Sequence, residues 1–275
     1  MSMSLRNELR QPLSNISLFR NSYNWEDWYS YVRQGAGAIN KANPNVLIFL
    51  SGLDSDATLE PVVQGEELKP GTATFKKSDF NGYADKLVLE LHMYLNINGP
   101  GPSDCNEVKD ELFGGGFQAL TDNAHNRFPV MMTEFGFGQD NQSTKTPYVQ
   151  CLMDYLVDQK AGWMIWALSG SYYIRQGKED ADEPWGLLTH DWSSWRASDF
   201  VEDDLIPMVN NTKAGLSLVP SGEKDPSDGG SSDDGGSNDE NSGVSLGGLV
   251  FRFGGISFSA LLLLVAVLSS LLIMV

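Results

Sequence analysis

Short apolar runs that alternate with helical stretches are the feature that most constrains the fold of this chain. The runs mostly lack polar alternation, as expected of parallel strands that are buried on both faces. They lie at 46–50, 87–91, 129–132 and 162–168, and residues 1–5 are interpreted as the end of a further strand. Helical stretches are predicted at 24–40, 108–126 and 146–160. This alternation predicts βαβ units and a parallel sheet, and therefore an α/β fold.

Polar side chains follow the predicted strands at the points where the strands end. In parallel α/β folds these C-terminal ends converge on one face, where the chemistry is placed. Two of the ends carry an acid, Glu8 and Glu134, and others carry His92, Tyr94 and Trp166. Glycoside hydrolysis needs two carboxyl groups that flank the scissile bond. A glycosidase is therefore one candidate function, although carboxylates at strand ends are common in other proteins too.

Five motifs occur in order along residues 1–200 and carry a family resemblance. They are MSLRNELR at 3–10, HMY at 92–94, TEFG at 133–136, WALSGSYYIRQG at 166–177 and EDADEPWGLL at 179–188. The series resembles glycoside hydrolase family 5, the cellulase family, and in particular its fungal and plant secreted members. The resemblance implies a (β/α)₈ TIM barrel and a retaining double-displacement hydrolase.

The resemblance also implies roles for six residues of this sequence. Glu8 matches the acid/base and Glu134 matches the nucleophile. Both roles have physical requirements, because a nucleophile must stay ionised whereas an acid must start protonated and so needs a raised pKa. The remaining four positions match residues that bind the sugar or flank the nucleophile, and they are Asn7, His92, Tyr94 and Trp166. For His92, the alternative that stays open is a structural histidine of the core whose hydrogen bonds are all made.

Other polar and aromatic residues are given no catalytic role. Asp182 and Glu183 are taken as solvated loop charges, and Trp185 as either a cleft wall or loop packing. We expect no metal and no other cofactor, because no cluster of histidine and acidic residues has metal-ligand spacing. The glycine run at 114–116 follows no strand and is not a phosphate-binding loop.

The resemblance covers only part of the family barrel. The strand end at Glu8 corresponds to the fourth strand of the barrel, so we expect about five of eight βα units, from a fragment, an incomplete gene model or a natural truncation. We expect the chain as given to be inactive and poorly folded, because its edge strands lack partners. A non-catalytic cell-surface glycan-binding remnant is the alternative to an enzyme, and the presence of both glutamates favours the enzyme. β-1,4-Glucan, β-mannan and β-1,3-glucan all stay open as the polysaccharide substrate.

Charge and cysteine content bear on partners and compartment. The formal net charge of −17 argues against nucleic-acid binding, which needs a basic face. Sequons at 15–17, 141–143 and 210–212 favour an extracellular glycoprotein. Cys105 and Cys151 could then form a disulfide, or could remain two unpaired, small hydrophobic residues. We expect a monomer.

Three regions follow one another along the chain. Residues 1–212 are predicted to be the partial catalytic domain, and 213–243 an acidic linker of Gly, Ser and Asp. In 244–275, an apolar run at 256–275 follows a spacer and the small residues 241–243. This pattern indicates a GPI-attachment signal, with a retained transmembrane helix as the rival. We therefore expect the protein at the outer face of the plasma membrane or in the cell wall, held to the membrane by this tail.

Overall fold

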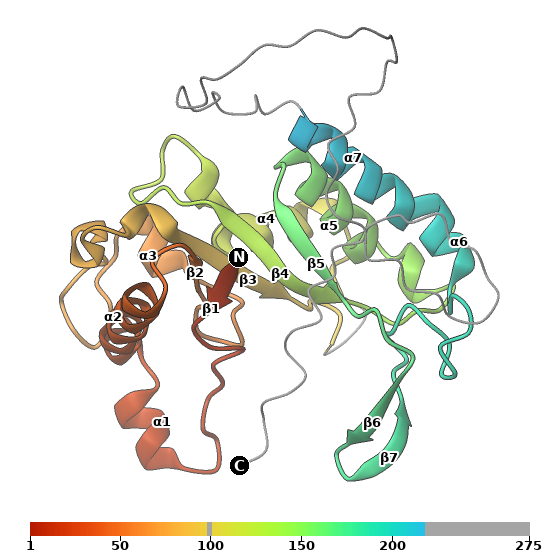
Figure 1. Ribbon diagram of the computed structural model, residues 1–275, viewed down its shortest axis with the longest axis horizontal. Coiled ribbons are helices and arrows are strands. Elements are labelled where there is room, and N and C mark those ends of the chain that lie inside the picture. Colours follow the sequence, from red (N-terminus) through yellow and green to blue (C-terminus); the bar gives the residue numbers. More distant parts are fainter. Residues whose placement is uncertain (98–100, 218–275) are drawn as a thin grey trace, which may run out of the picture. The chain divides into compact units, whose positions relative to one another are not determined.

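A parallel sheet is the centre of the computed structural model, which describes residues 1–97 and 101–217 (Figure 1). Its strands are β1 (Ser2–Ser4), β2 (Leu47–Leu50), β3 (Leu87–Met93), β4 (Val130–Gly136) and β5 (Gly162–Trp166). They pair in chain order, and every pairing is parallel. The predicted partial (β/α)₈ barrel is confirmed: five strands form a curled half-barrel. Within the described residues, β1 and β5 each pair with a single strand.

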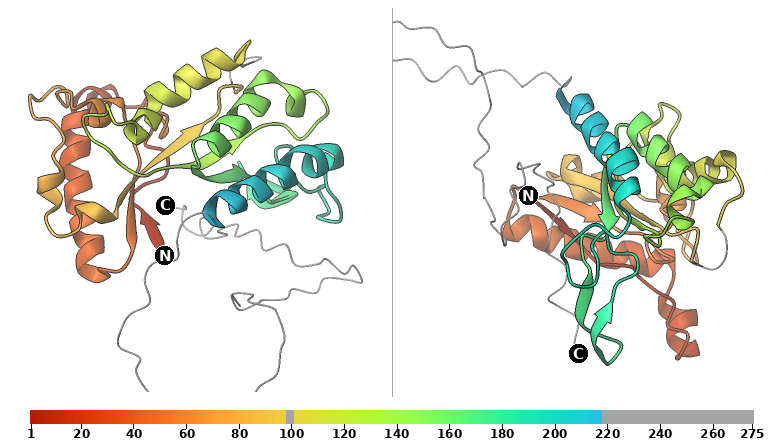
Figure 2. Two further views of the ribbon diagram at one scale, coloured as in Figure 1. Left: turned by 90° about the horizontal axis from the view of Figure 1, so that it is seen from above. Right: turned by 90° about the vertical axis from the view of Figure 1, so that its right-hand side faces the viewer.

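Helices lie along the outer side of the sheet, five of them in the crossovers between its strands and two after its last strand (Figure 2). They are α1 (Ile16–Ser22), α2 (Trp25–Ala42), α3 (Glu60–Gln64), α4 (Cys105–Gly115), α5 (Pro147–Asp158), α6 (Ser198–Phe200) and α7 (Ile206–Ser217). A π-helical segment, Val201–Leu205, joins α6 to α7, and 3₁₀ turns lie at Lys77–Phe80, Ala84–Lys86, Phe117–Leu120 and Ser143–Lys145. After β5, the strands β6 (Ser171–Arg175) and β7 (Lys178–Asp182) form an antiparallel hairpin that projects from the sheet (Figure 1).

Helix α2 shows how the sequence sets these elements. The Asn24 side chain caps its N-terminus by accepting a hydrogen bond from the backbone of the first turn. Trp28, Val32 and Ala36 follow at a spacing of four and are all buried. The Trp28 indole also donates to the carbonyl of Ser51 at 2.8 Å, so α2 is fixed to the residue that follows β2.

The side chains of strand β3 point alternately to the two sides of the sheet. Leu87, Leu89 and Leu91 belong to the hydrophobic core that the helices cover. The alternate residues Glu90 and His92 are equally buried but face the inside of the curve, because successive side chains point to opposite faces of a strand. Glu90 accepts a hydrogen bond there from Ser4 of β1. The inner side of this half-barrel is therefore lined with charged groups.

The predicted helix at 108–126 is wrong in its second half. Helix α4 starts earlier, at Cys105, and stops at Gly115, and the residues that follow the next 3₁₀ turn are not helical. The glycine run ends the helix because the backbone there meets the loop after β2. A Cβ at Gly115 would lie 2.8 Å from the carbonyl oxygen of Ala57, and the Gly115 carbonyl accepts from Leu59 at 2.7 Å. The run thus serves close packing.

The C-terminal regions predicted from the sequence fall mostly outside the described residues. Helix α7 continues to Ser217, into the segment predicted as linker. The rest of the linker, the apolar tail and the expected attachment site near Asn241 lie beyond residue 217 and are not described. Among the helices of the described part of the chain, none has both the length and the apolar content that crossing a membrane requires.

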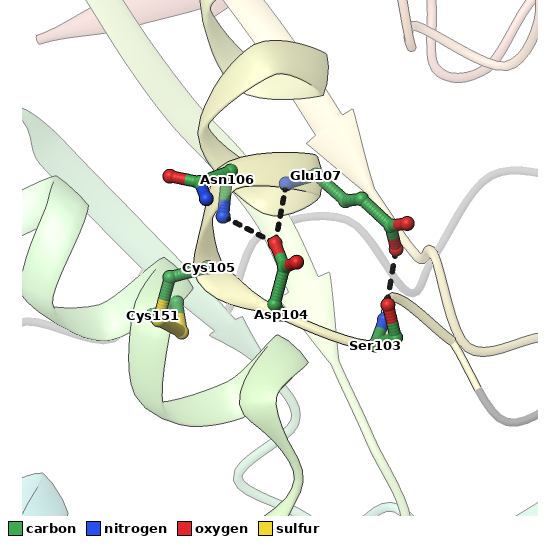
Figure 3. Close-up of a disulfide and its surroundings, with 6 residues drawn as sticks. All are labelled: Ser103, Asp104, Cys105, Asn106, Glu107 and Cys151. Carbon is green, nitrogen blue, oxygen red and sulfur yellow. Dashed lines mark hydrogen bonds between the residues drawn. A yellow bond between two sulfur atoms is a disulfide. The ribbon is translucent and has the colours of Figure 1, made fainter.

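A disulfide joins two of the outer helices (Figure 3). Cys105 at the start of α4 is bonded to Cys151 in α5, with 5.3 Å between their Cα atoms. The same end of α4 is capped by Asp104, whose carboxylate accepts from the backbone of Asn106 at 2.8 Å and of Glu107 at 3.2 Å. Of the two alternatives that the sequence left open, the structure has the bonded one.

Loss of this disulfide should lower the stability of the folded domain. The bond closes a loop with a sequence separation of 46 residues. The loss of chain entropy on closing such a loop corresponds to about 4 kcal/mol of stabilisation as an upper figure. In denaturant titrations, we expect the free energy of unfolding of a Cys105→Ser/Cys151→Ser variant to be lower than that of the wild type by a large part of this stabilisation. Dithiothreitol should destabilise the wild type and leave the variant unchanged; equal sensitivity of both proteins would contradict the assignment.

Candidate active site

Two glutamates meet at the carboxyl ends of the strands. Glu8 follows β1, and Glu134 lies near the end of β4. An oxygen of each carboxyl group and a ring nitrogen of His92 all lie within 4.8 Å of one another. The Glu8 backbone has a φ of 46°, which is unusual for a residue with a side chain and requires its surroundings to hold it.

His92 lies between the two carboxylates. Its Nδ1 is 2.7 Å from Glu134 Oε2 and 3.3 Å from Glu8 Oε1. The sheet register produces this contact, because a shift at His92 pairs this residue directly with Glu134 of the neighbouring strand. His92 is therefore buried in contact with both glutamates, which distinguishes it from an ordinary core histidine.

The carboxylates around His92 keep its imidazole charged. Burial opposes the charged form, but hydrogen bonds to Glu134 and Glu8 and the charges of Glu134 and Asp56 outweigh it and raise the pKa of His92 from 6.5 to about 10. Because the folded-state pKa is the higher one, this pairing stabilises the fold fully below pH 6.5. The contribution is then lost as the pH rises through about 10.

Glu8 departs from the expectation for an acid. Burial raises its pKa, but hydrogen bonds from His92 and Arg10 and the charges of both groups outweigh burial, so the pKa is lowered from 4.5. Arg10 forms an ion pair with Glu8 while its own side chain is 72% exposed. The predicted raised pKa is therefore wrong for this state of the site, because the pairing of Glu8 with Arg10 could not be predicted from the sequence.

Tyr94 contacts Glu134, and its ring lies against that of Trp185. Burial, the charge of Glu134 and a hydrogen bond to Glu134 raise the pKa of Tyr94, so its hydroxyl stays protonated and donates to that carboxylate. The rings of Tyr94 and Trp185 lie 5.6 Å apart. Trp185 also lines a cavity of about 470 Å³ together with Asn96 and Arg196. None of Glu8, His92 and Glu134 lines this cavity, so both alternatives for Trp185, a cleft wall and loop packing, stay open.

Trp166 is the last residue of β5, and its indole is hydrogen-bonded to Glu183. Its indole donates to Glu183 Oε2 at 3.2 Å. Glu183 is only 3% exposed, and it also accepts from Tyr172, from Arg175 at 2.8 Å and from the backbone of Trp185 at 3.0 Å. The interpretation of Glu183 as a solvated loop charge is therefore wrong, whereas its neighbour Asp182 is exposed.

Asn7 and Asp56 complete the surroundings of Glu8. The Asn7 side chain is exposed and takes part in none of the hydrogen bonds recorded for residues 1–97 and 101–217. Asp56, in the loop after β2, is fully buried, and its Oδ2 accepts from the Glu8 backbone at 2.7 Å. Asp56 is not among the site residues predicted from the sequence, because the burial of an acid in a polar loop cannot be predicted from the loop's composition.

Glu8, His92 and Glu134 are also the groups of the described chain that are close enough to share a metal ion. However, His92 presents the same nitrogen to both carboxylates, and its raised pKa keeps a proton on the ring. A hydrogen-bonded cluster accounts for these positions without an ion. The expectation of no metal stays a prediction.

Comparisons with known proteins decide the family. The model of the cellulase family, glycosyl hydrolase family 5, matches residues 3–171. A glycosyl hydrolase 5 family protein from Chamaecyparis obtusa is 34% identical over 216 residues, which cover 73% of this chain.

The chain belongs to glycosyl hydrolase family 5. One solved structure agrees at the level of the fold: a β-glucanase from Saccharophagus degradans has a TM-score of 0.50 at 13% identity over 76% of this chain. An endocellulase from Pyrococcus horikoshii has a TM-score of 0.46 at 16% identity over 68% of the chain. The matches span 34% of the Chamaecyparis protein, 53% of the β-glucanase and 48% of the endocellulase, so this family 5 chain corresponds to about a third to a half of each relative's length.

Removal of the Glu183 carboxylate should destabilise the base of the hairpin. In Glu183→Ala the Trp166 indole and the Trp185 amide lose their acceptor, which costs about 1–3 kcal/mol for each group that stays buried. We expect a lower free energy of unfolding and an altered tryptophan emission spectrum. Glu179→Ala is the matched control, since Glu179 is an exposed glutamate of the same hairpin. Equal stability of the two variants would show that the Glu183 contacts contribute nothing.

Proposed function

We propose that this chain carries both catalytic carboxyl groups of a retaining, cellulase-like glycoside hydrolase that cleaves a β-linked polysaccharide. One observation supports the retaining assignment above the others: carboxyl oxygens of Glu8 and Glu134 lie within 4.8 Å of one another. Retaining enzymes hold their carboxyl groups roughly 5–5.5 Å apart, whereas inverting enzymes need roughly 6.5–9.5 Å to admit a water molecule.

The proposed reaction has two steps. Glu134 attacks the anomeric carbon while Glu8 transfers its proton to the leaving oxygen, so the glycosidic bond breaks and a glycosyl ester of Glu134 forms. Glu8 then takes a proton from water, and the hydroxide oxygen displaces Glu134 from the anomeric carbon. Two inversions at one carbon retain its configuration, and both carboxyl groups return to their starting states.

The surroundings of the two glutamates suit these different roles. Glu134 accepts hydrogen bonds from His92 and Tyr94, which favour the ionised nucleophile. Glu8 is paired with Arg10, whose exposed side chain can be displaced by a sugar that enters the cleft. Loss of that cation raises the pKa of Glu8 toward the protonated state that an acid needs.

Binding of the sugar is assigned to residues next to the two glutamates. Trp166 would stack on the C–H face of the ring, with its orientation fixed by Glu183, and Asn7 would bind the 2-hydroxyl group. The β-glucanase from Saccharophagus degradans was crystallised with cellotetraose. A β-glucan is therefore the first substrate to test, with β-mannan next.

Substitution of the nucleophile tests the mechanism. In a version of the protein with all eight βα units, we expect Glu134→Ala to abolish hydrolysis of an activated aryl β-cellobioside while sugar binding remains. Azide should restore turnover by attacking the anomeric carbon from the side that the carboxylate had occupied, and so give the α-glycosyl azide. Glu111→Ala, at an exposed position of α4, is the matched control and should be fully active.

Two results would count against the assignment. Full activity of Glu134→Ala would remove Glu134 as the nucleophile, and an inverted first product from the wild type, followed by NMR, would remove the retaining mechanism. Trp166-dependent glycan binding without any hydrolysis by the wild type would favour the alternative, a non-catalytic glycan-binding protein of the cell surface.

We also propose that the C-terminal segment attaches the protein to the outer face of the plasma membrane. The support is the sequence pattern of small residues at 241–243, a spacer and the apolar run at 256–275. Treatment of intact cells with a phosphatidylinositol-specific phospholipase should release the protein. Retention on the cells, with the apolar peptide still present by mass spectrometry, would indicate a transmembrane helix instead.

A further inference from the structure

Asp56 occupies a position that the proposed chemistry does not yet use. Its side chain is fully buried at the inner side of the half-barrel, beside both Glu8 and His92. One carboxylate oxygen, Oδ2, accepts the Glu8 backbone N–H at 2.7 Å and lies 3.9 Å from His92 Nε2. The other oxygen, Oδ1, has no hydrogen-bond partner among the described residues. A buried carboxylate in this arrangement is costly unless a nearby cation compensates for it.

The loop that carries Asp56 is bound to the Glu8 segment at more than one point. Ser55 donates its backbone N–H to the carbonyl of Leu9 at 3.0 Å. The carbonyl of Asp56 accepts from the His92 backbone at 3.0 Å. Asp56 therefore contacts the backbones of both residues and faces the imidazole of one of them. Because Glu8 has a positive φ, its conformation depends on contacts of this kind.

We propose that Asp56 is a positioning residue, which fixes the backbone of Glu8 and orients the charged imidazole of His92 between the two glutamates. This inference rests on the proposed function for the role of Glu8. Asp56 touches neither the sugar nor the reacting atoms in this assignment. It acts through Glu8 by a hydrogen bond and through His92 by charge and by the backbone contact.

The electrostatics of the cluster agree with this role. Titratable groups surround His92: Glu8 after β1, Asp56 after β2, Glu90 on β3 and Glu134 on β4. Tyr94, after β3, contacts Glu134. Burial raises the pKa of Asp56 to about 7, although the Glu8 amide and the charge of His92 lower it. In the range near pH 10, where His92 loses its proton, Asp56 is therefore ionised and favours the charged imidazole.

The decisive experiment compares Asp56→Asn with Asp54→Asn in the full chain. Asparagine keeps the shape and an acceptor for the Glu8 amide and tolerates the positive φ that both positions share, so the fold should survive. Asp54 is exposed and lies outside the catalytic cluster. NMR titration of ¹⁵N-labelled histidines gives the pKa of His92 without any need for turnover. His125→Gln and His190→Gln variants assign its signal by elimination.

We expect the pKa of His92 to be lower in Asp56→Asn than in the wild type and unchanged in Asp54→Asn. In a version of the protein with all eight βα units, we expect kcat to fall by about 10-fold in Asp56→Asn and about 100-fold in Asp56→Ala, with KM nearly constant, because misplacement of a reacting group affects the chemical step. The basic limb of the pH–rate profile should move in the same direction as the His92 titration.

The outcomes separate this inference from the proposed function. An unchanged His92 titration together with unchanged kcat in Asp56→Asn would overturn the positioning role while hydrolysis by the wild type stands. A lowered His92 pKa, together with a complete eight-unit barrel that hydrolyses no β-glycan, would support the contact between Asp56 and His92 and overturn the proposed function. A loss of activity that only follows the folded fraction, with no change in the His92 titration, would reduce Asp56 to a structural residue.

Discussion

The pairing of His92 with the carboxylates around it is the interaction on which the site depends. The strands that carry these groups would otherwise place several acids together in a buried space, where like charges repel. A protonated imidazole 2.7 Å from Glu134 and 3.3 Å from Glu8 offsets this repulsion. The register of β3 against β4 supplies the contact, so the geometry of the sheet and the charge balance of the site have a common origin.

The same dependence explains why two chemically equal glutamates differ. Glu134 accepts hydrogen bonds from the buried His92 and the half-buried Tyr94, whereas Glu8 faces one buried donor and one exposed cation, Arg10. In the proposed mechanism, the sugar displaces the exposed partner and leaves the buried one in place. The proposed division of labour between the two carboxylates thus follows from which partners are fixed.

The sequence predicted the parallel strands and the residues at their ends, because apolar runs and strand-end acids are local patterns. It did not predict Asp56 or Glu183, since both are acids in polar loops whose burial arises only when distant segments pack against them. It also overextended the helix beyond Gly115, where contact with the Ala57 carbonyl decides the end. Hairpin β6–β7 was missed because its polar composition hides the pairing. The errors therefore concentrate where tertiary contacts override local composition.

The hairpin after β5 is bound to Glu183 by two residues of strand β6. Tyr172, near the base, and Arg175, next to the turn, donate hydrogen bonds to the buried Glu183, which also accepts from the Trp166 indole, whereas Tyr173 is 88% exposed. The tight turn at Gln176 and Gly177 lies outside these contacts. Substitutions at these two turn residues would then leave the contacts of Trp166 untouched. The turn is thus a place where the sequence can change while the orientation of Trp166 stays the same.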